Sequence, residues 1–356
     1  MNAVTPMPPQ PRDTPWPTVE WPTRSIDDVS GIDVAAVRDA LAELRDTPPE
    51  LGVTLATLAV HRGRLVVEQY GHGLDGAVDA ATTLISWSMA KSITQALFGV
   101  LIADGLLDRD AIDEPAPVPE FAGTDKAAIT IAQLLSMRSG LEFVEDYVDD
   151  SVSHCLEMLF GSGASDHAHY AASLPLQHAP GEKWNYSSGT SNILARIASD
   201  IIRRYGHDVR GFIRERLFER IGMTSAEPKF DAAGTFVGSS YVYATARDFA
   251  RFGYLYLRDG MWDGDRVVPE GWVDAARAVR SIDPDPPHYG YGDQWWIWRD
   301  QPGSVAAHGY EGQYVVVVPE RDLVVVHLGK VQSDVRAPLL HKLTALINAF
   351  PEASES

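Results

Sequence analysis

Ser88 and Lys91 stand three positions apart in segment 86–92. In a helix this spacing places both side chains on one face, within reach of each other. Lys91 is the only ionisable residue from Leu84 to Ala103, and an amine in apolar surroundings gives up its proton more readily. A serine hydroxyl beside such an amine has the arrangement of an activated nucleophile, and a helix N-terminus adds backbone amides that stabilise an oxyanion. The pair therefore predicts acyl transfer to a serine.

An ordinary structural role is also open to these two residues. Ser88 can cap the helix, and Lys91 can extend its ammonium to solvent. The spacing is nevertheless unusual in this chain, because none of the other five lysines has a serine three positions before it. We therefore treat Ser88 as a candidate nucleophile and Lys91 as its candidate proton acceptor.

Two further segments carry residues that would complete such a site. Tyr186 is the only one of the 13 tyrosines followed two positions later by Ser or Asn, here Ser188. A phenol beside an ammonium can relay a proton to a leaving group. Segment 306–313 contains Gly309 and Gly312, and glycines at a strand end let the backbone approach a ligand closely. The structural alternatives are a packed tyrosine at a helix start, with Ser188 as its cap, and a plain turn.

The elements that must position these motifs follow from the apolar patterns. Helical spacing predicts long helices at 33–45, 84–107, 188–205, 245–259 and 335–350, with shorter ones at 130–137, 151–160, 208–221 and 269–279. Residue types predict strands at 53–60, 65–70, 291–298, 313–318 and 323–328. Strands thus cluster at both ends of the chain, with helices between them.

This order predicts an α/β (α+β) fold in which the terminal strands share one sheet flanked by the terminal helices. A mostly helical subdomain is inserted into it. We expect a proline-rich arm at 1–30, a sheet domain at 31–86 and 245–356, and the helical subdomain at 87–244, with the active site between the two. The arm is expected to lie across the surface of its own fold or that of a neighbour.

In their order and spacing, the three motifs resemble the serine β-lactamase and penicillin-binding-protein family. Within it, the closer resemblance is to the cytoplasmic branch of 6-aminohexanoate-dimer hydrolases and related esterases. The likeness extends from about residue 54 to residue 350 and includes segments 135–141, 145–147, 239–248 and 291–296. It implies a β-lactamase-like antiparallel sheet and a serine hydrolase that acts on small esters or linear amides.

The resemblance also implies a role for each site residue. Ser88 would be the acylated nucleophile, while Lys91 and Tyr186 share the role of acylation base. The oxyanion hole would come from the backbone amides of Ser88 and Tyr310. Substrate binding would involve Tyr147, Ser188, Trp296, His308 and Gly309. Among these, Tyr147 resembles the tyrosine that closes over substrate in the nylon-oligomer branch.

Two positions depart from the family pattern. The third motif, which begins with Lys or His in the secreted branches, is here Ala307-His308-Gly309, so a cation for a substrate carboxylate is missing from its first position. This departure speaks against β-lactamase or D-amino-acid peptidase activity, which stays the alternative function. Ser188 stands where many relatives carry Asn.

Overall composition sets limits on the partners. The chain has 356 residues, with 30 basic and 49 acidic side chains and a net charge of −19, so it lacks the basic footprint that nucleic acids and anionic membranes require. Its start is rich in proline and lacks the apolar core of a signal peptide, and the longest apolar run near the middle, 96–103, is too short to span a bilayer. The single cysteine excludes an internal disulfide. We therefore expect a cytoplasmic monomer or homodimer.

Other classes of function fit less well. The 11 histidines and one cysteine show no H-E-x-x-H or C-x-x-C spacing, so neither a metal nor a cofactor is expected. The G-x-S-x-G elbow of another serine hydrolase fold is also missing from the sequence. A catalytically inactive binding or scaffold protein of the same fold is the alternative of another class, although Ser88, Lys91 and Tyr186 are all chemically competent.

Overall fold

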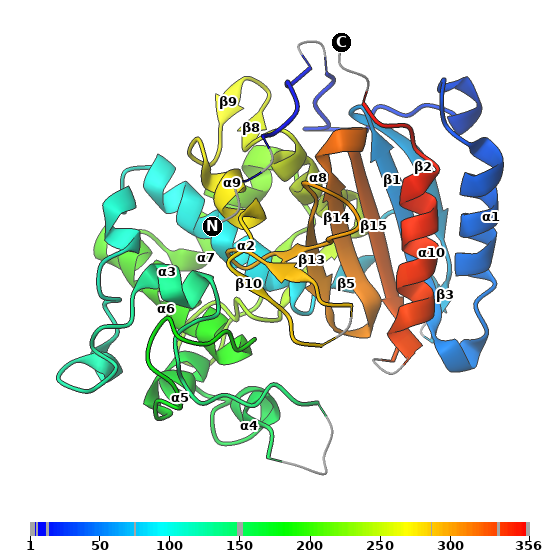
Figure 1. Ribbon diagram of the computed structural model, residues 1–356. Helices are drawn as coiled ribbons and strands as arrows, with labels where there is room; N and C mark the ends of the chain where they lie inside the picture. The colour runs from blue at the N-terminus through cyan, green and yellow to red at the C-terminus, as the bar shows by residue number, and fades with distance from the viewer. Residues whose placement is uncertain are drawn as a thin grey trace.

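The computed structural model of the protein describes residues 4, 6–11, 14–74, 76–147, 152–285, 287–332 and 335–353. In this part of the chain, eight strands form one antiparallel sheet in the order β10-β11-β12-β13-β14-β15-β1-β2 (Figure 1). They are β1 (Val53–His61), β2 (Arg64–Tyr70), β10 (Ser281–Ile282), β11 (Gly290–Tyr291), β12 (Trp296–Ile297), β13 (Val305–Gly309), β14 (Gln313–Val318) and β15 (Leu323–Lys330). Strand β1 pairs with β15, so the two ends of the chain close one sheet, as predicted.

The sheet is the middle layer of the fold, with apolar side chains on both faces. On β15, Val324, Val326 and Leu328 pack into one core, while Leu323 and Val325 pack into the other. Helices α2 (Met89–Ala103) and α8 (Ala246–Leu257) cover the first face, and α1 (Val34–Arg45) and α10 (Arg336–Asn348) cover the second (Figure 1). Because side chains alternate across a strand, one continuous apolar run serves both cores.

A group of helices lies beyond α2. It contains α3 (Ile131–Leu135), α4 (His154–Phe160), α5 (His167–Ser173), α6 (Ser188–Arg204) and α7 (Val209–Ile213). Helix α6 packs on α2, α3, α4, α5 and α7, and α2 in turn contacts β13 and β14. Helix α2 therefore joins the helical group to the sheet, and its first turn lies where the two parts meet.

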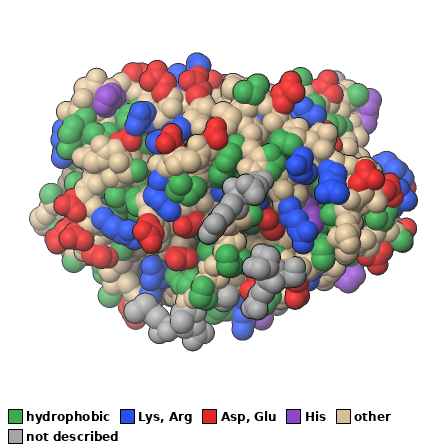
Figure 2. Space-filling model, turned by 90° about the horizontal axis from the view of Figure 1, so that it is seen from above, with side chains coloured by type: hydrophobic (Ala, Val, Ile, Leu, Met, Phe, Trp, Pro, Cys, Tyr) green, Lys and Arg blue, Asp and Glu red, His purple; other side chains and the backbone are tan. Residues whose placement is uncertain are grey.

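Short elements complete the fold. They are β3 (His72–Gly73), β4 (Gly76–Ala77), β5 (Thr83–Ile85), β6 (Glu227–Pro228), β7 (Val242–Thr245), β8 (Met261–Trp262), β9 (Asp265–Arg266) and α9 (Trp272–Arg277). Among the described ranges, no helix combines the length and the apolar character needed to cross a membrane. On the face shown in Figure 2, acidic side chains lie interspersed with lysines and arginines.

The helix predicted over 84–107 is shorter at both ends. Its first residues belong to β5, which pairs antiparallel with β7, and α2 begins at Met89 after a turn in which Trp87 has a φ of 43°. At the other end Gly105, with a φ of 70°, stops the helix, as glycine in the left-handed conformation commonly does. Local apolar spacing carries no information about β7, the distant strand with which residues 83–85 pair.

Two other predicted elements are divided. Segment 291–298 forms two short strands because the Gly292 amide donates to the Trp295 carbonyl over 2.9 Å, closing a turn between β11 and β12. Segment 208–221 begins as α7 and continues as a π-helical turn and a 3₁₀ turn. The other predicted helices and strands are present within a few residues of their expected bounds.

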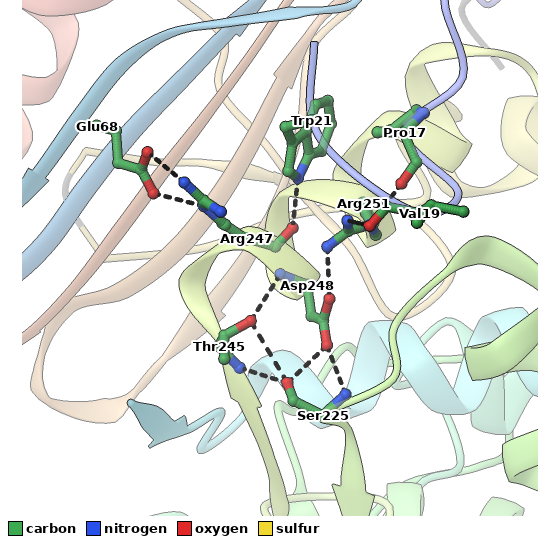
Figure 3. A network of polar contacts seen from close by, with 9 residues as sticks. All are labelled: Pro17, Val19, Trp21, Glu68, Ser225, Thr245, Arg247, Asp248 and Arg251. Atoms are coloured by element: carbon green, nitrogen blue, oxygen red, sulfur yellow. Dashed lines mark hydrogen bonds and ion pairs between the residues drawn. The ribbon is translucent and has the colours of Figure 1, made fainter. Parts of the chain in front are cut away.

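The described part of the proline-rich arm packs along α8 (Figure 3). Trp21 is buried and donates from Nε1 to the Arg247 carbonyl, while Arg251 donates from Nε to the Pro17 carbonyl over 2.7 Å. Asp248 holds Arg251 from within the helix, at 2.7 Å. The arm thus lies on its own fold, where it covers apolar surface of α8.

Candidate active site

Ser88 and Lys91 are hydrogen bonded at the start of α2. Lys91 Nζ donates to Ser88 Oγ over 2.8 Å, and the lysine is only 1% exposed. Ser88 occupies the N-cap position, but its hydroxyl makes no capping hydrogen bond. Neither structural alternative is realised: the serine hydroxyl does not cap the helix, and the ammonium does not reach solvent.

Two further acceptors hold the Lys91 amine. Nζ donates to Ser188 Oγ over 2.9 Å and to the Ser239 carbonyl over 3.1 Å. Helix α6 is capped by Ser187, whose hydroxyl accepts from the Thr190 amide at 3.0 Å. The alternative with Ser188 as the cap is therefore wrong, and the Ser188 hydroxyl is left to contact Lys91.

Glu145 extends this network and was not predicted as a site residue. Its Oε1 accepts from Ser188 Oγ over 2.5 Å, and its Oε2 accepts from the Ser188 amide over 2.6 Å. The N-terminus of α6 stabilises a carboxylate at this place through its free amides and dipole. A continuous chain of hydrogen bonds therefore runs from Ser88 through Lys91 and Ser188 to Glu145. The position of Glu145 two residues before Tyr147, a predicted substrate-binding residue, was the one signal in the sequence that could have indicated a role for Glu145 in the site.

Tyr186 approaches Lys91 with its ring. Lys91 Nζ lies 4.8 Å from the ring centroid, a cation–π arrangement. The same ring contacts Trp296, at 5.2 Å between ring centroids, and Tyr291 at 6.0 Å. Within the described ranges the Tyr186 hydroxyl has no hydrogen-bond partner, and the residue lines the cleft described below. Its hydroxyl is thus available to a ligand.

Gly309 brings the end of β13 against the turn that carries Ser88. A Cβ at position 309 would lie 2.3 Å from the Ser86 carbonyl oxygen, so only glycine permits this contact. Tyr310 follows as the first residue of a 3₁₀ turn, where an amide has no acceptor within the helix. The amides of Ser88 and Tyr310, which were predicted to form an oxyanion hole, therefore belong to two segments in direct contact.

A side-chain hydrogen bond ties these two segments together. Trp87 Nε1 donates to Glu311 Oε2 over 3.0 Å, and the indole meets the Tyr310 ring edge-on at 5.9 Å. Both partners have a left-handed backbone, with φ of 43° at Trp87 and 60° at Glu311. Such conformations are costly outside glycine and persist where the surrounding structure fixes them, often at functional sites.

A cleft of about 820 Å³ opens above the nucleophile. Its lining brings together these predicted residues: Ser88, Tyr147, Tyr186, Trp296, His308, Gly309 and Tyr310. Residues of α10 and of the loop between β10 and β11 also line the cleft, including Arg336 and Asp285. The predicted site residues, which extend in the sequence from Ser88 to Tyr310, thus line one cavity or hydrogen bond to a residue that lines it.

His308 is a buried neutral side chain in this cleft. Its ring stacks on Trp296 at 5.1 Å and its Nε2 accepts from Trp298 Nε1 over 2.7 Å. Burial, and then the charge of Arg336, lower the pKa of His308 well below its ordinary value. His308 therefore does not supply the cation that is missing at Ala307. In the described part of the chain, no three His, Cys, Asp or Glu side chains gather as metal ligands.

Comparisons with known proteins show which family the chain resembles. The sequence profile of the Beta-lactamase family matches residues 45–348. The 6-aminohexanoate-dimer hydrolase of Paenarthrobacter ureafaciens is 28% identical over 309 residues, which cover 82% of this chain and 76% of that protein.

Two solved structures share the fold over nearly the whole chain. A Bacillus anthracis protein described as a candidate 6-aminohexanoate-dimer hydrolase has a TM-score of 0.73 at 21% identity, covering 95% of this chain and 91% of that one. A family VIII carboxylesterase has a TM-score of 0.69 at 15% identity, covering 89% and 97%. With its antiparallel sheet and its matched profile, the chain is a serine hydrolase that belongs to the Beta-lactamase family.

Proposed function

We propose that the protein hydrolyses small esters and linear amides through an acyl-enzyme formed on Ser88. The observation that carries this proposal is the buried Lys91 amine, 2.8 Å from the Ser88 hydroxyl and directly below an open cleft. A serine hydroxyl is a weak nucleophile until a neighbouring base takes its proton. Buried beside Ser88, Lys91 is the group placed to do so.

The proposed reaction uses the groups around Ser88. As Oγ attacks the substrate carbonyl, its proton passes to Lys91 Nζ, and the amides of Ser88 and Tyr310 stabilise the oxyanion. The proton then moves by way of the Tyr186 hydroxyl to the departing alcohol or amine, while the bond to that group breaks. In the second half of the reaction, water attacks the carbonyl of the acyl-enzyme, the bond from that carbonyl to Ser88 Oγ breaks, and a proton from the water returns to Oγ as the acid is released.

Ser188 and Glu145 position the amine during these transfers. The Ser188 hydroxyl accepts from Lys91 and donates to Glu145, so the carboxylate at the N-terminus of α6 fixes the direction of that hydroxyl. Charge-assisted hydrogen bonds of this kind are about twice as strong as neutral ones. The Ser188 hydroxyl, fixed by Glu145, thus holds Lys91 Nζ in place beside Ser88.

Short esters and linear amides are the substrates that the site supports best. The similarity to a 6-aminohexanoate-dimer hydrolase favours linear amides, and the fold shared with a carboxylesterase favours esters. Ala307 carries no charge and His308 is neutral, so this position offers no cation to a β-lactam carboxylate, which weakens the case for β-lactams.

Turnover of three substrates tests the proposal. We expect hydrolysis of p-nitrophenyl acetate, weaker hydrolysis of 6-aminohexanoate dimer and little of nitrocefin, all lost in Ser88→Ala and in Lys91→Ala. Ser92→Ala is the matched control, because its hydroxyl is also buried in α2 but donates to the Gln294 carbonyl. Turnover that persists in Ser88→Ala would overturn the mechanism. A clear preference for nitrocefin would overturn the proposed substrate class. If the parent protein hydrolyses none of the three substrates, the result would favour the inactive scaffold protein instead.

A further inference from the structure

A second, smaller cavity also reaches Ser88. Its volume is about 120 Å³. Its walls come from α4, through Leu156, Leu159 and Phe160, and from Trp87 in the turn before α2. Tyr186, Trp296 and His308 line the wide cleft and are not part of this lining. The candidate nucleophile therefore lies where two cavities of very different size meet.

Tyr147 and Tyr310 form the wall that the two cavities share. Their ring centroids are 4.9 Å apart, and both residues line the wide cleft and the small cavity. The Tyr147 hydroxyl donates to Glu145 over 2.6 Å, which fixes the ring. A substrate carbonyl at Ser88 therefore has one substituent on each side of this tyrosine pair.

Among the described residues, the small cavity has an uncharged lining. Burial, followed by the negative charge of Glu145, raises the pKa of Tyr147 and of the Cys155 thiol well above their ordinary values, so both stay protonated. The other described side chains that line it are aliphatic, aromatic or hydroxyl groups. Such a surface favours an apolar ligand and disfavours an ionised one, because burial of an unpaired charge is costly.

The location of Tyr186 decides which part of a substrate enters which cavity. In the proposed reaction Tyr186 passes a proton to the leaving group, and Tyr186 lines the wide cleft. The leaving alcohol or amine must therefore lie in the wide cleft, and the acyl chain must point to the other side. We propose that the small cavity binds the acyl chain and gives short apolar chains the fastest turnover. This inference rests on the proposed function.

The cavity volume sets the preferred length. A water molecule occupies about 30 Å³ in the liquid, so about 120 Å³ holds about four water-sized groups. A butanoyl chain fits this space, whereas an octanoyl chain does not. Each added methylene that is buried raises kcat/KM about fourfold, so butanoyl esters should react about fifteenfold faster than acetyl esters. Longer chains should lose this gain.

A series of p-nitrophenyl esters tests the inference. We expect kcat/KM to be highest for the butanoyl ester among acetyl, butanoyl, octanoyl and dodecanoyl esters. Leu156→Ala enlarges the small cavity and should move the optimum toward octanoyl, whereas Leu159→Trp fills the cavity and should bring the butanoyl rate down to the acetyl rate. Leu340→Ala removes the same atoms from the wide cleft and should leave the position of the optimum unchanged.

A second series varies the alcohol instead, with ethyl, butyl and octyl acetates. If Leu156→Ala changes the alcohol preference and not the acyl preference, the assignment of the two cavities is wrong. An acyl optimum that moves with Leu340→Ala and not with Leu156→Ala would also overturn it. In both cases turnover would still depend on Ser88, so these outcomes are distinct from failure of the proposed function, in which Ser88→Ala leaves turnover intact.

Discussion

Replacing Gly309 by alanine is expected to reduce kcat while the protein stays folded. The new Cβ would lie 2.3 Å from the Ser86 carbonyl oxygen, whereas ordinary contact begins at 3.4 Å. Ser86 cannot yield, because its amide donates to the Val242 carbonyl over 2.8 Å and its hydroxyl accepts from the Val242 amide over 3.0 Å. The end of β13 must therefore move by about 1 Å and take the Tyr310 amide with it.

The size of the loss follows from that displacement. A misplacement of about 1 Å costs about a hundredfold in rate, and the loss of one oxyanion donor costs a hundredfold to about a thousandfold. We expect kcat for p-nitrophenyl acetate to fall about a hundredfold in Gly309→Ala with little change in KM, because the amide acts on the transition state. Rapid-mixing measurement of the acylation step reads this directly.

Gly71→Ala is the matched control. Its Cβ would lie 2.1 Å from the Thr54 carbonyl oxygen, a clash of the same kind, just beyond the end of β2 and outside both cavities. This variant should lose thermal stability and keep its kcat. A folded Gly309→Ala protein with the acylation rate of the parent would refute the role of the Tyr310 amide, as would an equal loss of kcat in Gly71→Ala.

Three further predictions concern the residues around the site and the core. Glu145→Gln should lower kcat about tenfold with little effect on KM, since hydrogen bonds to a charged partner contribute about 1.5–3 kcal/mol; an unchanged kcat would remove Glu145 from the mechanism. Trp87→Phe and Glu311→Gln should each lower kcat severalfold, and the double variant should lose no more than either single one, as kinetic measurement of all three proteins would show. Burial, and then Arg62, lower the pKa of His61 to about 4 from an ordinary 6.5, so the unfolded chain binds a proton where the folded one does not. The free energy of unfolding therefore has its full value above pH 6.5. It decreases as the pH falls toward 4, by about 2 kcal/mol near pH 5, because the unfolded chain then binds a proton at His61. Urea denaturation of the parent and of His61→Phe should show a smaller acid loss in the variant, and equal losses would contradict the assignment.

The parts of the site that could be predicted depend on short sequence spacings. Ser88 and Lys91 share a helical turn, and Tyr186 and Ser188 flank the start of another helix, so local geometry places each pair. Strand patterns at both ends of the chain likewise predicted that β1 and β15 belong to one sheet, because alternation and residue type are local signals.

The parts that could not be predicted depend on tertiary contacts. Glu145 lies in a loop, and its contact with Ser188 depends on where that loop meets α6. The start of α2 was misplaced because β7, more than 150 residues away, captures 83–85 as a strand. The small cavity also arises only when α4 is packed beside the turn at Trp87, which no sequence pattern reports.

The most direct test of the mechanism is the intact mass of the protein after reaction with a fluorophosphonate. The proposed mechanism predicts a single adduct on the peptide that contains Ser88, formed far more slowly in Lys91→Ala and not at all in Ser88→Ala. A parent protein that stays unmodified, or an adduct that forms equally in Ser88→Ala, would contradict the assignment of Ser88 as the nucleophile.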